Sequence, residues 1–298
     1  MTWTLLLLLS LLQNPARTTC AWSPAEEVGS LGPAVNESSG MAISRRIPNR
    51  SYRINDSGDS GRFYVMGLNG GDTKTINIAG FNPIDTEDMA IGPCSNFEDC
   101  IFVGDIGDNA RRRTYVELVV IEERADFPSD VQPAHRIRLR YPGGPRDAEG
   151  LGVHPDGNVY ITTKDTVRSE IFRLKRDQWQ KVAEGEAALE LVATLDWEML
   201  RPKTLAFTRM VTGMSIAPDG KSFVLLNYGD AMEFFVDLSA PGIDAAKWAD
   251  GADYRTISLV TLEQEESIAY FPNGKTILYD TERSPNAPRA RIMRMECR

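Results

Sequence analysis

One short pattern recurs five times along this 298-residue chain and constrains its fold more than any other feature. Each copy is a polar residue, glutamate in three of the five, followed by a run of small and apolar residues. The copies begin at Ser39, Glu87, Glu149, Thr212 and Glu266, with 48, 62, 63 and 54 residues between successive starts. β-Propeller blades repeat about every 40 to 50 residues, and loop insertions lengthen this interval. The spacing therefore predicts one structural unit repeated around a ring.

The interior of each repeat also fits a propeller blade. Pro-Asp-Gly or Pro-Asn-Gly triplets at 155–157, 218–220 and 272–274 predict tight turns, because proline presets one φ angle and glycine accepts a positive one. Strand-like segments follow the turns, and several alternate apolar with polar residues. The third strand of the second unit is expected at 113–117. Four strands in each of five units predict an all-β, five-bladed propeller.

The last repeat has room for only three strands before Arg298, so its fourth strand must come from elsewhere. Residues 26–31 could supply it from the N-terminus, which would close the ring. A six-bladed ring is the alternative, since the two longest intervals could hide a degenerate blade. A β-sandwich would leave the repeated pattern unexplained.

The N-terminus carries an apolar run at residues 5–12 that is too short to span a bilayer. It resembles the core of a secretory signal peptide. We therefore expect residues 1–22 to be a signal peptide, residues 23–298 to form a single propeller domain, and the protein to be secreted or periplasmic, without a membrane anchor.

The four cysteines fit an oxidising compartment. Cys94 and Cys100 bracket a short polar segment between two expected strands, so a hairpin disulfide is predicted there. Cys20 and Cys297 lie near opposite ends of the chain. Either they form a bridge that ring closure brings within reach, or Cys20 leaves with the signal peptide and Cys297 is a free thiol.

The composition is that of an ordinary globular domain. Hydrophobic residues make up 42% and charged residues 25% of the chain. The formal net charge of −9 argues against nucleic-acid binding, which needs a basic face. We expect a monomer whose partner is a small molecule or a carbohydrate, bound at the central mouth.

Acidic residues recur at two places that a propeller brings to one face. These are the start of each innermost strand and the loop between the second and third strands. Clustered carboxylates repel one another unless a cation offsets their charge. Oxygen ligands of this kind suit Ca²⁺ better than Zn²⁺, and the chain has only two histidines. The predicted Ca²⁺ ligands are Glu87, Asp88, Glu149, Glu266, Asp56 and Asn227.

Two of these openings support a family resemblance. The segment 86–89 before a strand, and 149–151 before a Pro-Asp-Gly turn, resemble blade openings of the calcium-dependent lactonase propellers, the paraoxonases and gluconolactonase-type enzymes. The resemblance implies that Glu87 reaches a catalytic calcium and Asp88 a structural one. The chain departs from that family in having five predicted blades instead of six. The repeat also resembles uncharacterised exported bacterial propellers.

Two functions from different classes follow. The first is a Ca²⁺-dependent hydrolase of a small ester, lactone or phosphoester, in which Asp105 or Asp280 activates water. Lys164, the one cation in the loop series, would neutralise a carboxylate or orient an anionic group; residues 111–113, three arginines, are expected at a solvated edge. Metal-free glycoside hydrolysis by two glutamates is a variant. The second is a non-catalytic binding or scaffold propeller with a structural ion.

Overall fold

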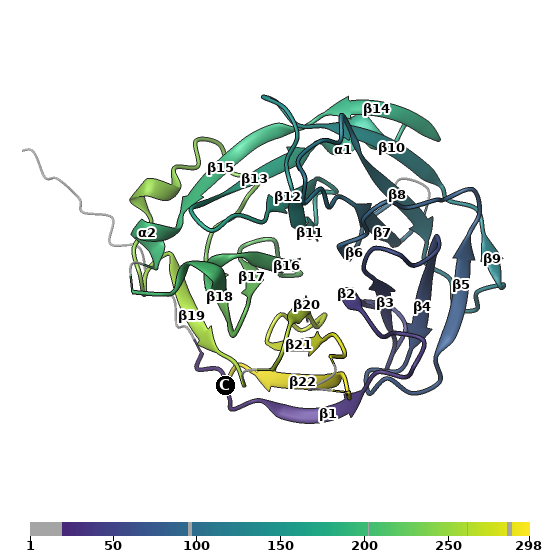
Figure 1. Cartoon of the computed structure of the whole chain (residues 1–298), viewed down its shortest axis with the longest axis horizontal. Helices are drawn as coiled ribbons and strands as arrows, with labels where there is room; N and C mark the ends of the chain where they lie inside the picture. Colours follow the sequence, from purple (N-terminus) through teal and green to yellow (C-terminus); the bar gives the residue numbers. More distant parts are fainter. Residues whose placement is uncertain (1–19, 95–96, 202, 261, 285–287) are drawn as a thin grey trace, which may run out of the picture.

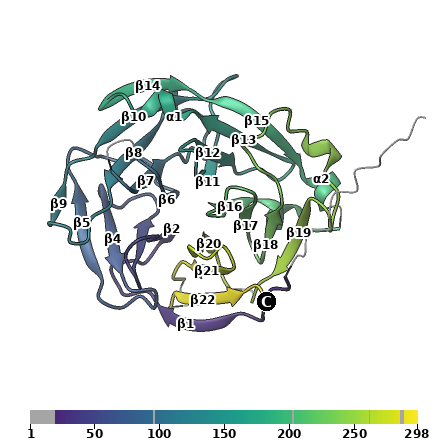
Figure 2. The ribbon, with the colours of Figure 1, turned by 180° about the vertical axis from the view of Figure 1, so that it is seen from behind.

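The computed structural model describes residues 20–94, 97–201, 203–260, 262–284 and 288–298. Five small sheets stand around a common centre like the blades of a wheel, and the same ring is seen from both faces (Figures 1 and 2). The predicted five-bladed, all-β architecture is confirmed, and the six-bladed alternative is wrong.

Each blade is built around three or four antiparallel strands in chain order, from the centre outwards. The first blade contains β2 (Ser38–Ile43), β3 (Ser51–Asn55), β4 (Arg62–Met66) and β5 (Lys74–Ile78). The second contains β6 (Asp88–Gly92), β7 (Cys100–Asp105), β8 (Val116–Glu122) and β10 (His135–Arg140). The third contains β11 (Ala148–Val153), β12 (Val159–Thr163), β13 (Arg168–Leu174) and β15 (Glu190–Asp196). The fourth contains β16 (Val211–Ile216), β17 (Phe223–Asn227), β18 (Asp230–Phe234) and β19 (Tyr254–Ser258).

Two blades carry an extra outer strand, and short helices fill connections. β9 (Asp130–Val131) pairs in parallel with β5, and β14 (Glu184–Ala188) pairs in parallel with β10. The helical turns are α1 (Arg176–Trp179), α2 (Trp197–Leu200), η1 (Ala206–Arg209) and η2 (Ala245–Lys247). Within the described ranges, no helix has the length and apolar character needed to span a bilayer.

The fifth blade joins both ends of the chain. It contains β20 (Glu265–Tyr270), β21 (Thr276–Thr281) and β22 (Arg291–Glu296), and the N-terminal strand β1 (Glu26–Ser30) pairs antiparallel with β22 at its outer edge. In Figure 1, β1 and β22 lie side by side next to the C-terminus. The predicted closure by an N-terminal strand is confirmed.

Two disulfides reinforce this architecture. Cys94 pairs with Cys100 inside the second blade, and Cys20 pairs with Cys297 across a sequence separation of 277 residues. Both pairs confirm the predicted bridges, and the alternative of a free thiol at Cys297 is wrong. Residues 1–19 of the expected signal peptide lie outside the described residues. Cys20 forms a disulfide with Cys297, and Ala21 exchanges two backbone hydrogen bonds with Arg298. Two residues of the expected signal peptide, 1–22, therefore take part in closing the ring.

Apolar side chains from facing sheets form the core between adjacent blades. Between the second and third blades, for example, the fully buried Trp179 packs edge-on against Phe102, with ring centroids 5.2 Å apart. Packing of this kind fixes neighbouring blades relative to one another. The starting ends of the innermost strands are therefore held together on one face, where the polar residues of the repeat converge.

Candidate functional site

Three carboxylates meet at the mouth of the central channel. One oxygen from each of Asp56, Asp85 and Glu87 lies within 4.8 Å of the other two. Asp56 follows β3, whereas Asp85 and Glu87 belong to the connection that enters β6. Glu87 is buried, and the two aspartates are partly exposed towards solvent. Two adjacent blades thus bring together side chains that are about thirty residues apart, as the propeller topology requires.

Gly107 allows two of these carboxylates to approach the β7–β8 loop. A Cβ atom at this position would lie 2.3 Å from Glu87 Oε1 and 2.5 Å from Asp85 Oδ2. Distances this short are excluded by van der Waals contact, so a larger residue would displace both carboxylates. The Gly107 N–H also donates to the Asp85 carbonyl oxygen at 3.1 Å. The glycine therefore shapes the cluster directly.

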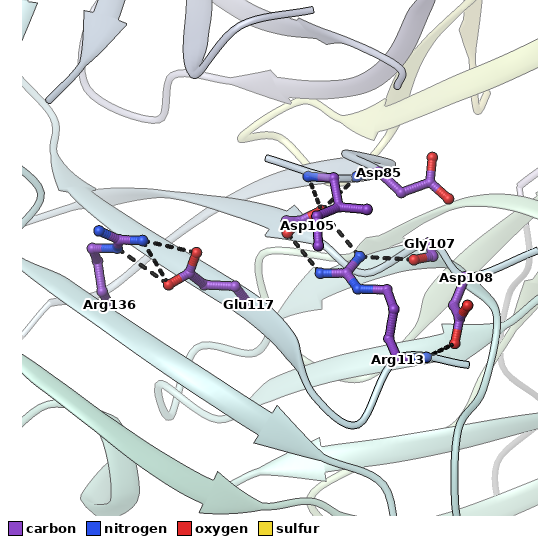
Figure 3. Close-up of polar contacts among 8 residues, drawn as sticks. Asp85, Asp105, Gly107, Asp108, Arg113, Glu117 and Arg136 are labelled. Atoms are coloured by element: carbon purple, nitrogen blue, oxygen red, sulfur yellow. Dashed lines mark hydrogen bonds and ion pairs between the residues drawn. The ribbon is translucent and has the colours of Figure 1, made fainter. Parts of the chain in front are cut away.

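An ion pair underneath the cluster fixes the backbone that carries Asp85. Asp105 accepts hydrogen bonds from the N–H groups of Ile84, at 3.1 Å, and Asp85, at 2.7 Å. Its two oxygens are also bonded to the Arg113 guanidinium at 3.1 and 2.7 Å, and Arg113 donates to the Gly107 carbonyl at 2.8 Å (Figure 3). The predicted solvated edge is wrong for Arg113, whose side chain is 10% exposed. This pair ties the Gly107 loop to the Asp85 connection.

The other two entry glutamates, Glu149 and Glu266, lie around Lys164 and Tyr228. The Lys164 ammonium donates to Glu149 Oε1 and lies 3.3 Å from the Tyr228 hydroxyl. Tyr228 in turn donates to Glu266 Oε1 at 2.9 Å. Glu149 Oε2 is buried and has no hydrogen-bond partner among the described residues. The structure thus brings the three predicted glutamates to one mouth, and one buried carboxylate oxygen remains available.

Burial and mutual repulsion raise the pKa values of these acids. Burial raises the pKa of the Glu87 carboxyl well above its ordinary value, and the charge of Glu149 adds to this rise. Burial raises the pKa of Glu149 to about 7 although Lys164 opposes it, and raises the pKa of Asp85 to about 6. The pKa of Glu282 rises to about 7 for the same reason, reinforced by Asp56. Without a cation, the mouth therefore disfavours its own ionised form.

Asp88, the predicted second calcium ligand, lies deeper and has different partners. Its fully buried carboxylate accepts hydrogen bonds from the N–H groups of Met89 at 2.7 Å, Leu151 at 2.8 Å and Met214 at 3.1 Å. These donors belong to β6, β11 and β16. One carboxylate at the axis therefore links the innermost strands of three blades.

Asp280 and Asn227 are also fully buried, each among polar partners of its own. Asp280 accepts hydrogen bonds from Ser38, Ser267 and the Arg53 guanidinium, the last at 2.7 Å. The Asn227 amide donates to the Arg209 carbonyl at 2.7 Å. Like Asp105, Asp280 is ion-paired with an arginine, so neither predicted base is a free carboxylate.

Several residues at the mouth were not among the predicted site residues. They are Asp85, Gly107, Asp147, Tyr228 and Glu282. Asp85 lies two residues before Glu87, and Tyr228 begins the Tyr-Gly turn of a β-hairpin, so local patterns could have indicated both. Gly107 carries no such signal, because its role depends on side chains from another segment.

The donor set fits an oxygen-preferring cation. The cluster offers carboxylate oxygens only, and no histidine or cysteine belongs to it. Glu149 contributes a further carboxylate to the mouth, and its charge adds to the effect of burial in raising the pKa of Glu87. Several carboxylates with a raised pKa are the arrangement that Ca²⁺ stabilises, whereas Zn²⁺ prefers nitrogen and sulfur.

Comparisons with known proteins identify no family. No protein-family model matches the chain, and no curated protein matches it. Among solved structures, a luciferin-regenerating enzyme is similar at 8% identity and a TM-score of 0.47, over 91% of this chain and 94% of that one. A nidogen/laminin complex is similar at 15% identity and a TM-score of 0.45, over 82% and 72% of the two chains. The WD40 repeats of RRP9 are similar at 11% identity and a TM-score of 0.42, over 88% and 67%. None of these similarities transfers an activity to this chain.

Proposed function

We propose that this propeller is an exported protein whose mouth binds one Ca²⁺ and hydrolyses a small ester, lactone or phosphoester. The cation ligands would be Asp56, Asp85 and Glu87, with Glu149 Oε2 as the fourth. One observation carries the proposal: three carboxylates from two blades converge within 4.8 Å of one another. An uncompensated cluster of this kind destabilises the fold, whereas a bound cation would turn it into a stabilising contact.

A calcium ion in this position would polarise the scissile oxygen of an ester as a Lewis acid. Lys164 is already fixed against Glu149 and would offer its ammonium to the developing oxyanion. Glu282 is the better base candidate at the mouth, because its pKa of about 7 suits proton transfer at neutral pH. Asp105 and Asp280 would instead position their neighbours through their arginine pairs.

Non-catalytic binding with a structural ion is the second candidate. The ion pairs of Asp105 with Arg113 and of Asp280 with Arg53 favour it, because both aspartates that were predicted to activate water are already bonded to a guanidinium. The lactonase resemblance of segments 86–89 and 149–151 favours the hydrolase. The mouth still has a candidate general base, because the pKa of Glu282 is raised to about 7. We therefore place the hydrolase first.

Ester hydrolysis measured with and without calcium tests the proposal. The substrates are p-nitrophenyl acetate, γ-butyrolactone and bis-p-nitrophenyl phosphate, assayed with metal-stripped protein and again after addition of CaCl₂. The proposal predicts calcium-dependent turnover of at least one substrate and its loss in Glu87→Gln. Calcium binding without turnover of any substrate would favour the structural ion.

A further inference from the structure

A second feature lies beside the mouth on the same face of the propeller. It is a groove of about 540 Å³, and the arginines Arg111, Arg146 and Arg168 contribute to its lining. We call it the arginine groove. The three residues come from the β7–β8 loop, the connection that enters β11, and the start of β13. Three separate segments therefore bring a guanidinium group to one place.

Acidic side chains hold each arginine in position. Arg111 pairs with Asp165 at 2.8 Å, Arg146 with Glu170 at 2.5 Å, and Arg168 with Asp196 at 3.3 Å. These pairs offset most of the positive charge of the groove, so net charge alone does not draw an anion to it. It should instead select a ligand by hydrogen bonding and by shape.

The guanidinium groups retain donors for such a ligand. A guanidinium has five N–H donors in a planar fork that matches carboxylate and phosphate oxygens. Among the described residues, the side chains of Arg111 and Arg168 each bond to one carboxylate, and they are 53% and 66% exposed. Each carboxylate fixes its guanidinium, and the remaining N–H groups are open to the groove.

Two loops connect the groove directly to the mouth. In the β12–β13 loop, Lys164 bonds to Glu149 in the mouth, and the next residue, Asp165, holds Arg111 in the groove. In the β7–β8 loop, Gly107 contacts Glu87, and Arg111 follows four residues later. Asp147 also lines the groove, and its charge contributes to the raised pKa of Asp85, so the groove and the mouth are neighbouring sites.

The backbone at Arg111 supports a ligand-binding role. Its φ angle is +51°, a left-handed conformation that is unfavourable for a residue with a Cβ atom. A hydrogen bond from the Arg111 N–H to the Asp108 carbonyl, 2.7 Å long, closes the turn that imposes this angle. Such local strain often occurs at ligand-binding positions.

We propose that the arginine groove binds the oxyanion of the same ligand whose ester group reaches the mouth. This rests on the proposed function and names its substrate class: a small ester that also carries a phosphoryl or carboxylate group. The groove supplies hydrogen bonds to the anion, and the mouth supplies the cation site.

Binding of two small anions tests this proposal. Phenylphosphonate and benzoate are titrated into the parent protein, both metal-stripped and with calcium, and the affinities are measured by calorimetry. The variants are Arg111→Gln and Arg168→Gln. Arg138→Gln is the matched control, because its side chain is 52% exposed but lies on β10, outside the groove. We expect each groove variant to weaken binding about tenfold, the usual effect of losing a charge-assisted hydrogen bond.

The outcomes separate this proposal from the calcium site. Binding of either anion that depends on Arg111 and Arg168 supports the groove even if calcium does not bind, and the two probes distinguish phosphoryl from carboxylate ligands. Absence of anion binding to the parent protein, or an equal loss of affinity in the Arg138→Gln control, would contradict the proposed role of the groove. The proposed calcium site is tested separately, by titration with CaCl₂.

Discussion

Asp105 and Arg113 form a bidentate ion pair beneath the carboxylate cluster, with nitrogen–oxygen distances of 3.1 and 2.7 Å. The same aspartate accepts the backbone N–H of Asp85, and the same arginine holds the Gly107 carbonyl. The pair therefore connects the two segments that shape the proposed cation site, although neither side chain belongs to the cluster itself.

Replacing Arg113 should weaken calcium binding. In Arg113→Gln the Gly107 loop and the Asp85 connection lose their common anchor, and we expect calcium affinity to fall about 10- to 100-fold, as for other residues that orient metal ligands. Calorimetric titration measures this change. Arg136→Gln is the control, because Arg136 forms a comparable ion pair with Glu117 on the same blade, away from the cluster (Figure 3). Equal affinities in Arg113→Gln and Arg136→Gln would contradict the positioning role.

A methyl group at position 107 should displace two of the proposed ligands. The Cβ atom of Gly107→Ala would overlap Glu87 and Asp85, so we expect a loss of at least about tenfold in calcium affinity, equivalent to ~1.4 kcal/mol. Gly32→Ala serves as the control, because a Cβ at Gly32 would meet only one atom, at 4.0 Å. Unchanged affinity in Gly107→Ala would show that the cation binds elsewhere.

The metal-free protein should lose stability as the pH rises from about 5 to about 7. The folded protein raises the pKa of Asp85 to about 6 and that of Glu149 to about 7, so it holds more protons in this range than the unfolded chain. The free energy of unfolding therefore falls with increasing pH. Saturating calcium should abolish this decline, because bound carboxylates stay ionised. Melting curves of metal-stripped and calcium-loaded protein test this, and parallel pH profiles in the two states would contradict it.

Asp88 should behave as a structural residue and not as a calcium ligand. In Asp88→Asn at least one of its backbone donors loses a good acceptor, at roughly 1–3 kcal/mol for each buried N–H. We expect the same drop in urea-measured stability with and without calcium. Glu87→Gln is the contrasting variant, since it should lower stability only when calcium is present. A drop confined to calcium-loaded Asp88→Asn would instead support the calcium role that the lactonase resemblance implies.

Much of the fold was predictable because its signals are local. Proline–glycine turns, strand alternation and the recurring opening pattern indicated five blades and the closing N-terminal strand. The outer strands β9 and β14 were not predicted, since their pairing depends on neighbours already in place. The third strand of the second blade was expected at 113–117 but spans Val116–Glu122, because Arg113 belongs to the ion pair at the mouth.

The site was predictable only as far as the topology determines it. Convergence of Glu87, Glu149 and Glu266 follows from the ring, whatever their neighbours are. The pairing of acids with arginines does not: Arg53 and Asp280 are 227 residues apart, and nothing in the sequence connects them. The sequence alone therefore predicts a free carboxylate at Asp280, whereas in the folded chain one arginine and two serines donate hydrogen bonds to it.

Calorimetric titration of metal-stripped protein with CaCl₂, for the parent and for Glu87→Gln, tests the central claim most directly. Glu117→Gln is the control, because this carboxylate pairs with Arg136 and does not belong to the cluster. The account predicts saturable binding of one Ca²⁺ per chain in the parent and in Glu117→Gln, and its loss in Glu87→Gln. Absence of saturable binding in the parent, or undiminished binding in Glu87→Gln, would contradict it.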